Sequence, residues 1–163
     1  MDECKVYIID DSAEVRQAIN LLMSSVGLEV VEFESADAFL SEDRDIAKLE
    51  GCILLDVRMP GMSGLALLEH LQQIKCSPPV IMISGHGDIP MAVKAVQEGA
   101  INFIEKPFNE QELLDNVHRA FKLDSIQRGK NMKVQSIKKR LNSLTSREKE
   151  VLYAVTEGQR NKL

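Results

Sequence analysis

The chain is poor in the residues that mark several specialised classes of protein. It contains no tryptophan, and aromatic residues make up only 4% of its 163 residues. Its three cysteines, Cys4, Cys52 and Cys76, are odd in number and form no CxxC pair, so neither a disulfide framework nor a zinc site is expected. Nine glycines and five prolines are too few for a collagen-like or low-complexity chain.

Long apolar segments are also missing. Runs such as VIMI at residues 80–83 are far shorter than the roughly 20 residues that a helix needs to cross a bilayer. The amino-terminal MDECK lacks the charged-then-apolar layout of a signal peptide. With 44% hydrophobic and 28% charged residues, the composition is that of a globular protein. We therefore expect a cytoplasmic protein that does not associate with a membrane.

The net charge of −5 conceals an uneven distribution along the chain. Residues 1–122 hold 10 basic and 21 acidic residues, a net −11, whereas residues 123–163 hold 10 and 4, a net +6. An acidic body followed by a basic tail indicates two units with different partners. The alternative explanation for the tail is a solvated basic helix surface.

Short apolar runs alternate with segments of helical periodicity up to residue 121. Strands are predicted at residues 5–10, 29–34, 51–56, 78–84 and 100–107, and helices at residues 12–26, 36–42, 65–74, 90–100 and 109–121. Five strands, each followed by a helix, predict an α/β fold with a doubly wound parallel sheet. The runs IIDD, CILLD and VIMIS are continuous rather than alternating, as expected of strands buried on both faces.

The basic tail, residues 123–163, differs in composition from the rest of the chain, and its pattern predicts a helical extension after the sheet. Residues 123–141 are polar and basic and favour a helical linker, with Gly129 as a break or flexible joint. A short apolar stripe, too short to predict a coiled coil, follows steps of 3, 4 and 3 and is suited to packing on a neighbour: Val134, Ile137, Leu141 and Leu144. Thr145 and Glu148 form a capping-box pattern at the start of a last helix.

Polar residues that could bind a ligand or react lie at the ends of the predicted strands. Asp56 ends the apolar run ILLD, the pair Asp10 and Asp11 ends the first strand, and Ser84 and Lys106 end the fourth and fifth. Because the carboxyl ends of parallel strands share one edge of the sheet, where such folds bind ligands, we expect these side chains to lie together.

The acidic members of this set need a cation. Two unit charges about 4 Å apart cost roughly 4 kcal/mol at an effective dielectric constant near 20. Mg²⁺ prefers oxygen ligands, and Mn²⁺ is an alternative. Asp11, Asp56 and a backbone carbonyl just after Asp56 would bind the ion directly, and Asp10 would bind it through water. A carboxylate is also a competent nucleophile for phosphoryl transfer. We assign that role to the central Asp56, with Lys106 and Ser84 binding the phosphoryl oxygens.

These residues, in this order and spacing, resemble the receiver domain of two-component response regulators over residues 1–122. The closer resemblance is to the FixJ-type group of the NarL/FixJ family, carried by ISGHGDIPMAVKAVQEGAINFIEKPF. Residues 142–163, with LTSREKEVL followed by EGQRNK, resemble the start of a LuxR-type helix-turn-helix domain and stop before most of it. The resemblance implies a flavodoxin-like strand order, 2-1-3-4-5.

The resemblance also implies a mechanism for the strand-end site. A sensor histidine kinase would donate a phosphoryl group to Asp56, with Mg²⁺ held by Asp11, Asp56 and the carbonyl of Arg58. Ser84 and Phe103 match the family's switch pair, in which the hydroxyl moves toward the phosphate and the ring turns inward. Ser84 departs from the commoner threonine and lacks its methyl group.

The resemblance has further implications for the surroundings of that site and for the partners of the protein. The peptide bond between Lys106 and Pro107 would be cis. Arg58 and His86 flank the site, where they either tune dephosphorylation or are simply solvated. Phosphorylation would promote a homodimer through the fourth helix, fifth strand and fifth helix, and a longer protein with the complete helix-turn-helix domain would bind DNA.

Two other functions remain open from the sequence. One is a Mg²⁺-dependent phosphatase or phosphotransferase with an aspartyl nucleophile. Such enzymes tend to carry a second acid two residues after the nucleophile, where this chain has Arg58. The other is a stand-alone receiver-like module that only binds proteins, although such a module is typically expected to lose an acidic residue or the lysine of the site.

Overall fold

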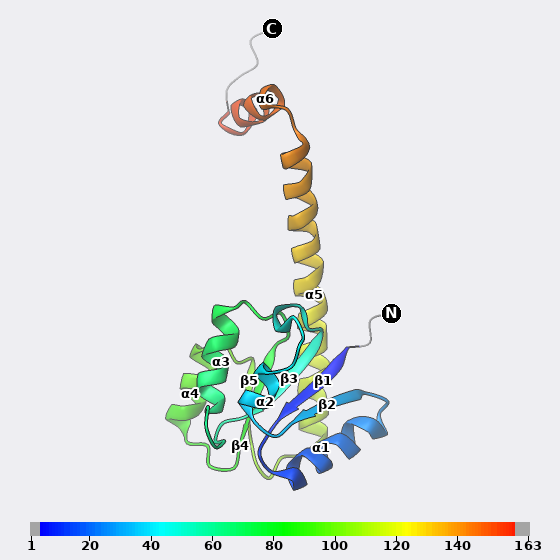
Figure 1. Cartoon of the computed structure of the whole chain (residues 1–163), viewed down its shortest axis with the longest axis vertical. Helices are drawn as coiled ribbons and strands as arrows, with labels where there is room; N and C mark the ends of the chain where they lie inside the picture. The colour runs from blue at the N-terminus through cyan, green and yellow to red at the C-terminus, as the bar shows by residue number, and fades with distance from the viewer. Residues whose placement is uncertain (1–3, 159–163) are drawn as a thin grey trace. The chain divides into compact units, whose positions relative to one another are not determined.

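The computed structural model describes residues 4–158, and its centre is a five-stranded parallel sheet in the order β2-β1-β3-β4-β5 (Figure 1). The strands are β1 (Lys5–Ile9), β2 (Glu29–Phe33), β3 (Gly51–Asp56), β4 (Val80–Ser84) and β5 (Asn102–Glu105). The predicted fold and strand order are confirmed. The reversal of order between β1 and β3 creates the switch point at which open α/β sheets bind ligands.

The helices alternate with these strands and begin at residues suited to helix starts. They are α1 (Ala13–Ser25), α2 (Ala36–Leu40), the short 3₁₀ helix η1 (Ile46–Lys48), α3 (Gly64–Gln73), α4 (Ile89–Gln97), α5 (Glu110–Ser143) and α6 (Ser146–Thr156). In the first four α-helices the preceding residue accepts a backbone N–H with its side chain: Ser12, Ser35, Ser63 and Asp88. Each cap satisfies a helical N–H that would otherwise lack a partner.

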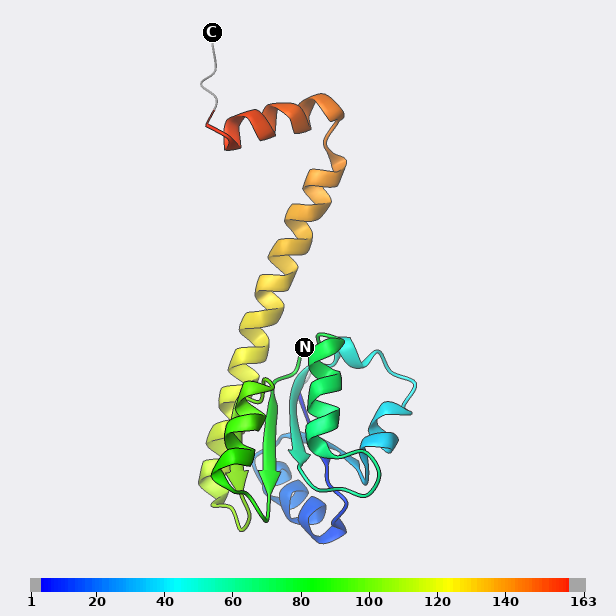
Figure 2. The same ribbon diagram turned by 90° about the vertical axis from the view of Figure 1, so that its left-hand side faces the viewer.

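The two faces of the sheet are covered by different helices (Figure 2). Along β1, Tyr7 and Ile9 join the core beneath α2, α3 and α4, whereas Val6 and Ile8 join the core beneath α1 and α5. Successive side chains of a strand point to opposite faces, so both sets of residues must be apolar. This arrangement explains why the strands appear as continuous apolar runs in the sequence.

Helix α5 differs most from the prediction. It was expected to end near residue 121, with a joint at Gly129, but it runs without interruption for 34 residues to Ser143. The predicted break is therefore wrong. Glycine inside a helix costs only about 1 kcal/mol relative to alanine, and the neighbouring Arg128 and Lys130 favour helix. Contacts divide the chain between Ile126 and Gln127, close to the expected boundary after residue 122, and α5 runs through both units.

A buried carboxylate fixes α5 to the sheet beyond the point where the sequence prediction ended. Asp124 is fully buried, and it accepts hydrogen bonds from the Gly51 backbone N–H at 3.0 Å and from the Ser77 hydroxyl at 3.2 Å. Both partners lie at the amino ends of strands β3 and β4 or in the loop before them. This contact extends the part of α5 that packs on the sheet by one turn.

The second unit contains the rest of α5 and the helix α6. The predicted capping box at the start of α6 is confirmed: the Thr145 hydroxyl accepts the Glu148 N–H, and the Glu148 carboxylate accepts the Thr145 N–H. Residues 159–163 of the predicted helix-turn-helix fragment lie outside the described residues. Within residues 4–158, no helix is long and apolar enough to cross a membrane.

Candidate functional site

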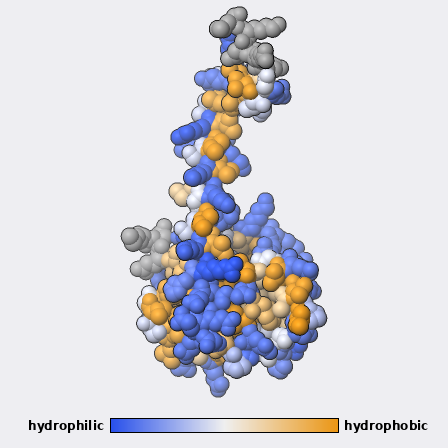
Figure 3. Space-filling model, turned by 180° about the vertical axis from the view of Figure 1, so that it is seen from behind, coloured by the Kyte–Doolittle hydropathy of each residue, from blue (hydrophilic) through white to orange (hydrophobic). Residues whose placement is uncertain are grey.

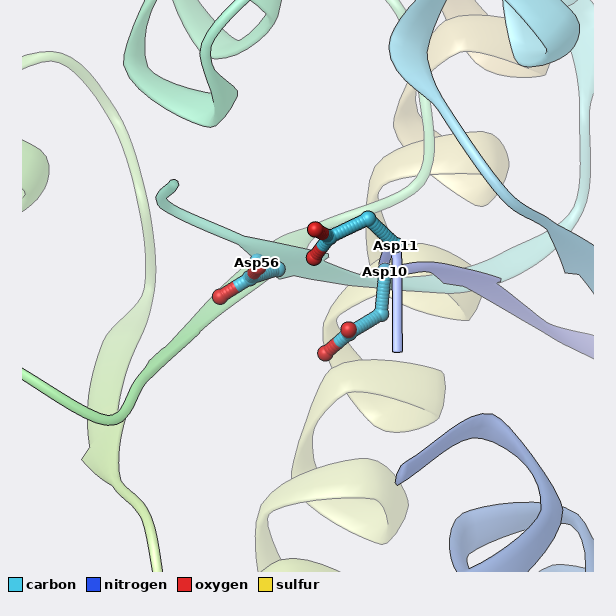
Figure 4. Close-up of side chains that lie close together, drawn as sticks. All are labelled: Asp10, Asp11 and Asp56. Atoms are coloured by element: carbon cyan, nitrogen blue, oxygen red, sulfur yellow. The ribbon is translucent and has the colours of Figure 1, made fainter. Parts of the chain in front are cut away.

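Three carboxylates meet at the carboxyl edge of the sheet (Figure 4). Asp56 is the last residue of β3, and Asp10 and Asp11 directly follow β1, its neighbour in the sheet. One oxygen of each carboxylate lies within 4.8 Å of the others. Asp10 and Asp56 are buried, whereas Asp11 is exposed. Parallel pairing of β1 with β3 thus brings together residues that lie more than 40 positions apart.

Lys106, which follows β5, reaches across β4 to this cluster. Its Nζ lies 2.7 Å from Asp10 Oδ2 and 3.4 Å from Asp56 Oδ1. The sequence argument assigned the offsetting charge to a metal ion and assigned Lys106 to the phosphoryl group. The structure shows that the ammonium already offsets part of the negative charge. One ammonium cannot balance three carboxylates, so the cluster retains an excess of negative charge.

Asp10 is fixed in orientation by residues that the sequence reasoning missed. Its Oδ1 accepts the Ser12 backbone N–H at 2.8 Å, and its backbone carbonyl accepts a hydrogen bond from Arg16 Nη1 at 2.7 Å. Arg16 also lies 3.6 Å from the Glu32 carboxylate. These contacts hold the turn between β1 and α1 so that Asp10 faces the cluster.

Burial raises the pKa of Asp56 to about 6. Loss of solvent is the largest cause, and the neighbouring Asp10 charge raises the pKa further, while Lys106 lowers it. The Asp56 side chain is only 7% exposed, yet it remains at the surface edge of the sheet. A carboxylate that is costly to ionise is well placed to gain from a nearby cation, which stabilises its charged form.

The loop after Asp56 returns close to its own start because residue 64 is glycine. The Gly64 N–H donates to the Val57 carbonyl at 2.9 Å. A Cβ at position 64 would lie 1.9 Å from the Asp56 carbonyl oxygen, which no side chain can tolerate. The sequence reasoning treated PGMSG as a turn but did not identify this close approach. A glycine at the start of a helix following a strand-end acid is the signal that would have found it.

The predicted switch pair is linked through one short loop. The Ser84 hydroxyl accepts the backbone N–H of His86 at 3.2 Å, and a Cβ on Gly87 would come within 2.5 Å of the Phe103 ring. Residues 85–87 therefore touch both Ser84, which is buried, and Phe103, which is partly exposed. The two side chains thus contact the same short loop.

Three other site predictions are located as follows. Arg58 is exposed on the loop after β3, and His86 is exposed on the loop after β4. The peptide bond between Lys106 and Pro107 is cis. The strand-end residues thus gather at one edge, with Arg58 and His86 at its rim.

The donor set of the cluster fits a hard divalent cation. Its ligands are carboxylate oxygens on three residues, and part of the negative charge is not offset by Lys106. Oxygen-only sites of this kind suit Mg²⁺ or Mn²⁺ rather than zinc, which prefers nitrogen and sulfur ligands.

The family is shown by comparison with known proteins. Residues 6–118 match the family model described as the response regulator receiver domain. The chain belongs to the response regulator family. It is therefore a response regulator of two-component signalling, a class whose receiver domain contains the acidic cluster described above.

Named relatives include transcriptional regulators. Response regulator protein TodT of Pseudomonas putida is 46% identical over 157 residues, which cover 96% of this chain and 68% of that protein. Transcriptional regulatory protein FixJ of Rhizobium meliloti is 38% identical over 162 residues, covering 99% of this chain and 78% of that protein. The resemblance to the FixJ group is thus confirmed.

Solved structures show the same architecture. The response regulator StyR superposes with a TM-score of 0.86 at 40% identity, covering 98% of this chain and 79% of that chain. Full-length FixJ from B. japonicum superposes with a TM-score of 0.70 at 34% identity, covering 99% and 78%. The receiver fold and the segment after it therefore both have structural counterparts.

Proposed function

We propose that this response regulator accepts a phosphoryl group from a sensor histidine kinase on Asp56, and that the modification changes its dimerisation surface. The observation that carries the proposal is the cluster of Asp10, Asp11 and Asp56, with Lys106 bound to two of them, at the switch point of the sheet. The proposal needs a nucleophile, a metal site and a positive side chain that binds the phosphoryl group. Asp56, the three-carboxylate cluster and Lys106 would supply them.

In the proposed transfer, an Asp56 carboxylate oxygen forms a bond to phosphorus as the bond from phosphorus to the kinase histidine nitrogen breaks. The nitrogen keeps the electron pair of that bond. Lys106 exchanges its contact with Asp56 for a phosphoryl oxygen, and the Ser84 hydroxyl donates to another. Asp11, Asp56, the Arg58 carbonyl and, through water, Asp10 would hold Mg²⁺ or Mn²⁺. The ion supplies positive charge to the phosphoryl oxygens.

A groove beside the site supports the kinase as partner. It has a volume of about 470 Å³ and is lined by residues of α1 and of the loop from β5 to α5, namely Glu14, Val15, Ala18, Lys106, Pro107 and Phe108. The lining is mostly apolar, and it includes the lysine that binds the cluster. Lys106 belongs to both the groove and the acidic cluster, so we propose that a kinase helix docked in the groove would present its histidine to the cluster.

The exposed surface of α4 supports the dimer face. Ile89, Val93 and Val96 expose large apolar side chains there, and Ile89 is 81% exposed. Phe103 lies on β5 and touches Gly87 in the loop just before α4. Movement of Ser84 toward a phosphoryl group would release the His86 N–H, let the Phe103 ring turn inward and alter this face. We therefore propose a homodimer through α4, β5 and α5.

The tail supports a role in transcription. We propose that residues 123–141 form the linker and that residues 142–163 begin a LuxR-type helix-turn-helix domain. The capped helix α6 would be its first helix. A longer protein with the complete domain would bind DNA as a dimer, whereas residues 1–163 alone would not bind an operator specifically.

Incubation with a small acyl phosphate and Mg²⁺, followed by intact mass measurement, tests the proposal. We expect one added phosphoryl group per chain, none in Asp56→Asn and none when the metal is chelated. Exposed Asp115 offers a matched control, and Asp115→Asn should be labelled like the wild type. Continuous release of phosphate without stoichiometric labelling would instead favour a phosphatase, and an unlabelled, folded protein would favour a module that only binds proteins.

A further inference from the structure

Helix α5 carries an exposed apolar stripe that becomes longer once the helix is continuous through Gly129. Alternating steps of 4 and 3 residues along α5 lead to six positions: Leu123, Gln127, Lys130, Val134, Ile137 and Leu141. All of them are apolar except Gln127 and Lys130. The apolar members with their exposed fractions are Leu123 at 38%, Val134 at 49%, Ile137 at 56% and Leu141 at 38%. Figure 3 shows apolar side chains following one another along this segment.

The spacing identifies the kind of partner that covers the stripe. A helix that packs on a globular surface presents a wide apolar face, whereas a helix that pairs with one other helix presents a narrow seam with a repeat of 3.5 residues. The stripe has alternating steps of 4 and 3, and the other large exposed apolar side chains of α5, Ile126 and Met132, lie outside it. Its repeat is therefore that of a seam for a single partner helix.

The charges in and beside the seam would oppose pairing of two identical helices. No acidic residue occurs between Asp124 and Glu148, whereas seven basic residues do. Lys130 occupies a position in the seam, and Lys133 and Lys138 flank it on opposite sides; all three are exposed. In a parallel pair of identical helices, Lys133 of one chain lies beside Lys138 of the other, so the two ammonium groups repel.

We infer that the partner is α5 of a second copy of this chain, and that the two seams close only when the receiver domains pair. This inference rests on the proposed dimer through α4, β5 and α5. Because α5 belongs to that face, two receivers joined there bring two identical seams to high effective concentration. Lys130 and the pair of Lys133 with Lys138 keep the seam open in the unpaired state. A lysine at one core position fixes the register at a cost in stability.

Reversing one charge tests the inference directly. Lys133→Glu converts two repulsive contacts of the parallel pair into attractive ones, and we expect dimer affinity to rise roughly tenfold at low salt. The matched control is Lys139→Glu, which makes the same charge change on the opposite side of the same helix and should leave the affinity unchanged. Sedimentation of residues 1–163 with Mg²⁺ and beryllofluoride, an imitation of an acyl-bound phosphoryl group, measures both.

The salt dependence of dimerisation distinguishes a second copy of α5 from an acidic partner. Raising the ionic strength from about 0.05 M to about 0.5 M screens the lysine repulsion, so it should strengthen the wild-type dimer. Equal effects of Lys133→Glu and Lys139→Glu, or a dimer that weakens with salt, would overturn the inference in favour of an acidic protein or nucleic acid on the basic helix.

A substitution within the seam distinguishes an error in the proposed seam from an error in the proposed phosphorylation of Asp56. Ile137→Asp should weaken the dimer while Asp56 remains fully labelled by acyl phosphate in the same samples. An Ile137→Asp dimer as strong as the wild type would refute the seam. Lack of labelling in the wild type would refute the proposed function alone. The seam would still be tested, because sedimentation of Lys133→Glu at high protein concentration measures dimer formation without phosphorylation.

Discussion

At the scale of single residues, the site depends on a carboxylate that the fold makes costly to ionise. Asp56 is nearly buried, lies beside Asp10 and has only partial compensation from Lys106 at 3.4 Å. Its pKa of about 6 exceeds the ordinary value of 3.8, so the folded protein binds a proton at Asp56 more tightly than the unfolded chain does. This tighter proton binding adds to the free energy of unfolding. The addition is present in full below about pH 4 and is lost as the pH rises through about 6.

Replacement of Asp56 should therefore stabilise the protein in a pH-dependent manner. Without divalent metal, we expect Asp56→Asn to have a free energy of unfolding about 2 to 3 kcal/mol higher than the wild type at pH 8, because the uncharged amide avoids the cost of a buried charge. Near pH 4 the difference should nearly vanish. Urea unfolding at both pH values, with a chelator present, measures it. A difference of equal size at pH 4 and pH 8 would refute this explanation.

At the scale of elements, the sequence predicted what depends on local periodicity and missed what depends on distant contacts. The strands and the first four helices were found because apolar runs and helical spacing are local signals. The extent of α5 was missed because Asp124 finds its partners at Gly51 and Ser77, far away along the chain. Gly129 was given too much weight as a break, since a single glycine costs less than the flanking helix-forming residues supply.

The continuity of α5 gives a prediction at Gly129. A Cβ at this position would meet no atom within 4 Å, so Gly129→Ala adds a methyl group without a clash. We expect the substitution to stabilise the surrounding helix by about 0.5 to 1 kcal/mol. Amide hydrogen exchange of residues 127–141 should slow several-fold, with β3 unaffected. Faster exchange, or a loss of helical content, would mean that Gly129 is needed as a joint.

At the scale of the whole molecule, the site is foreseeable because a parallel sheet places all its strand ends at one edge. Asp10, Asp56 and Lys106 were grouped on this ground alone, and the structure joins them by direct contacts. Their detailed partners were not foreseeable. The ion pair of Lys106 with Asp10 and the hydrogen bond from the His86 N–H to Ser84 depend on backbone turns that have no periodic signal.

The proposed dimer gives a prediction at the same scale. With Mg²⁺ and beryllofluoride, the wild type should dimerise, and Ile89→Asp should weaken the dimer at least tenfold, because it places a charge in an apolar contact. The matched control is Leu21→Asp on α1, another exposed apolar residue, which is outside the proposed face. Sedimentation equilibrium measures both. Equal weakening by the two variants would exclude α4 as part of the interface.

The central claim is that the acidic cluster exists to make Asp56 a phosphoryl acceptor, and the chemical identity of the new bond tests it most directly. After treatment with acyl phosphate and Mg²⁺, borohydride reduces an acyl phosphate to an alcohol and leaves ordinary carboxylates unchanged. Peptide mapping should then find the reduced side chain at position 56 alone. Reduction at another residue, or at none in a protein that remains folded and binds magnesium, would contradict the account.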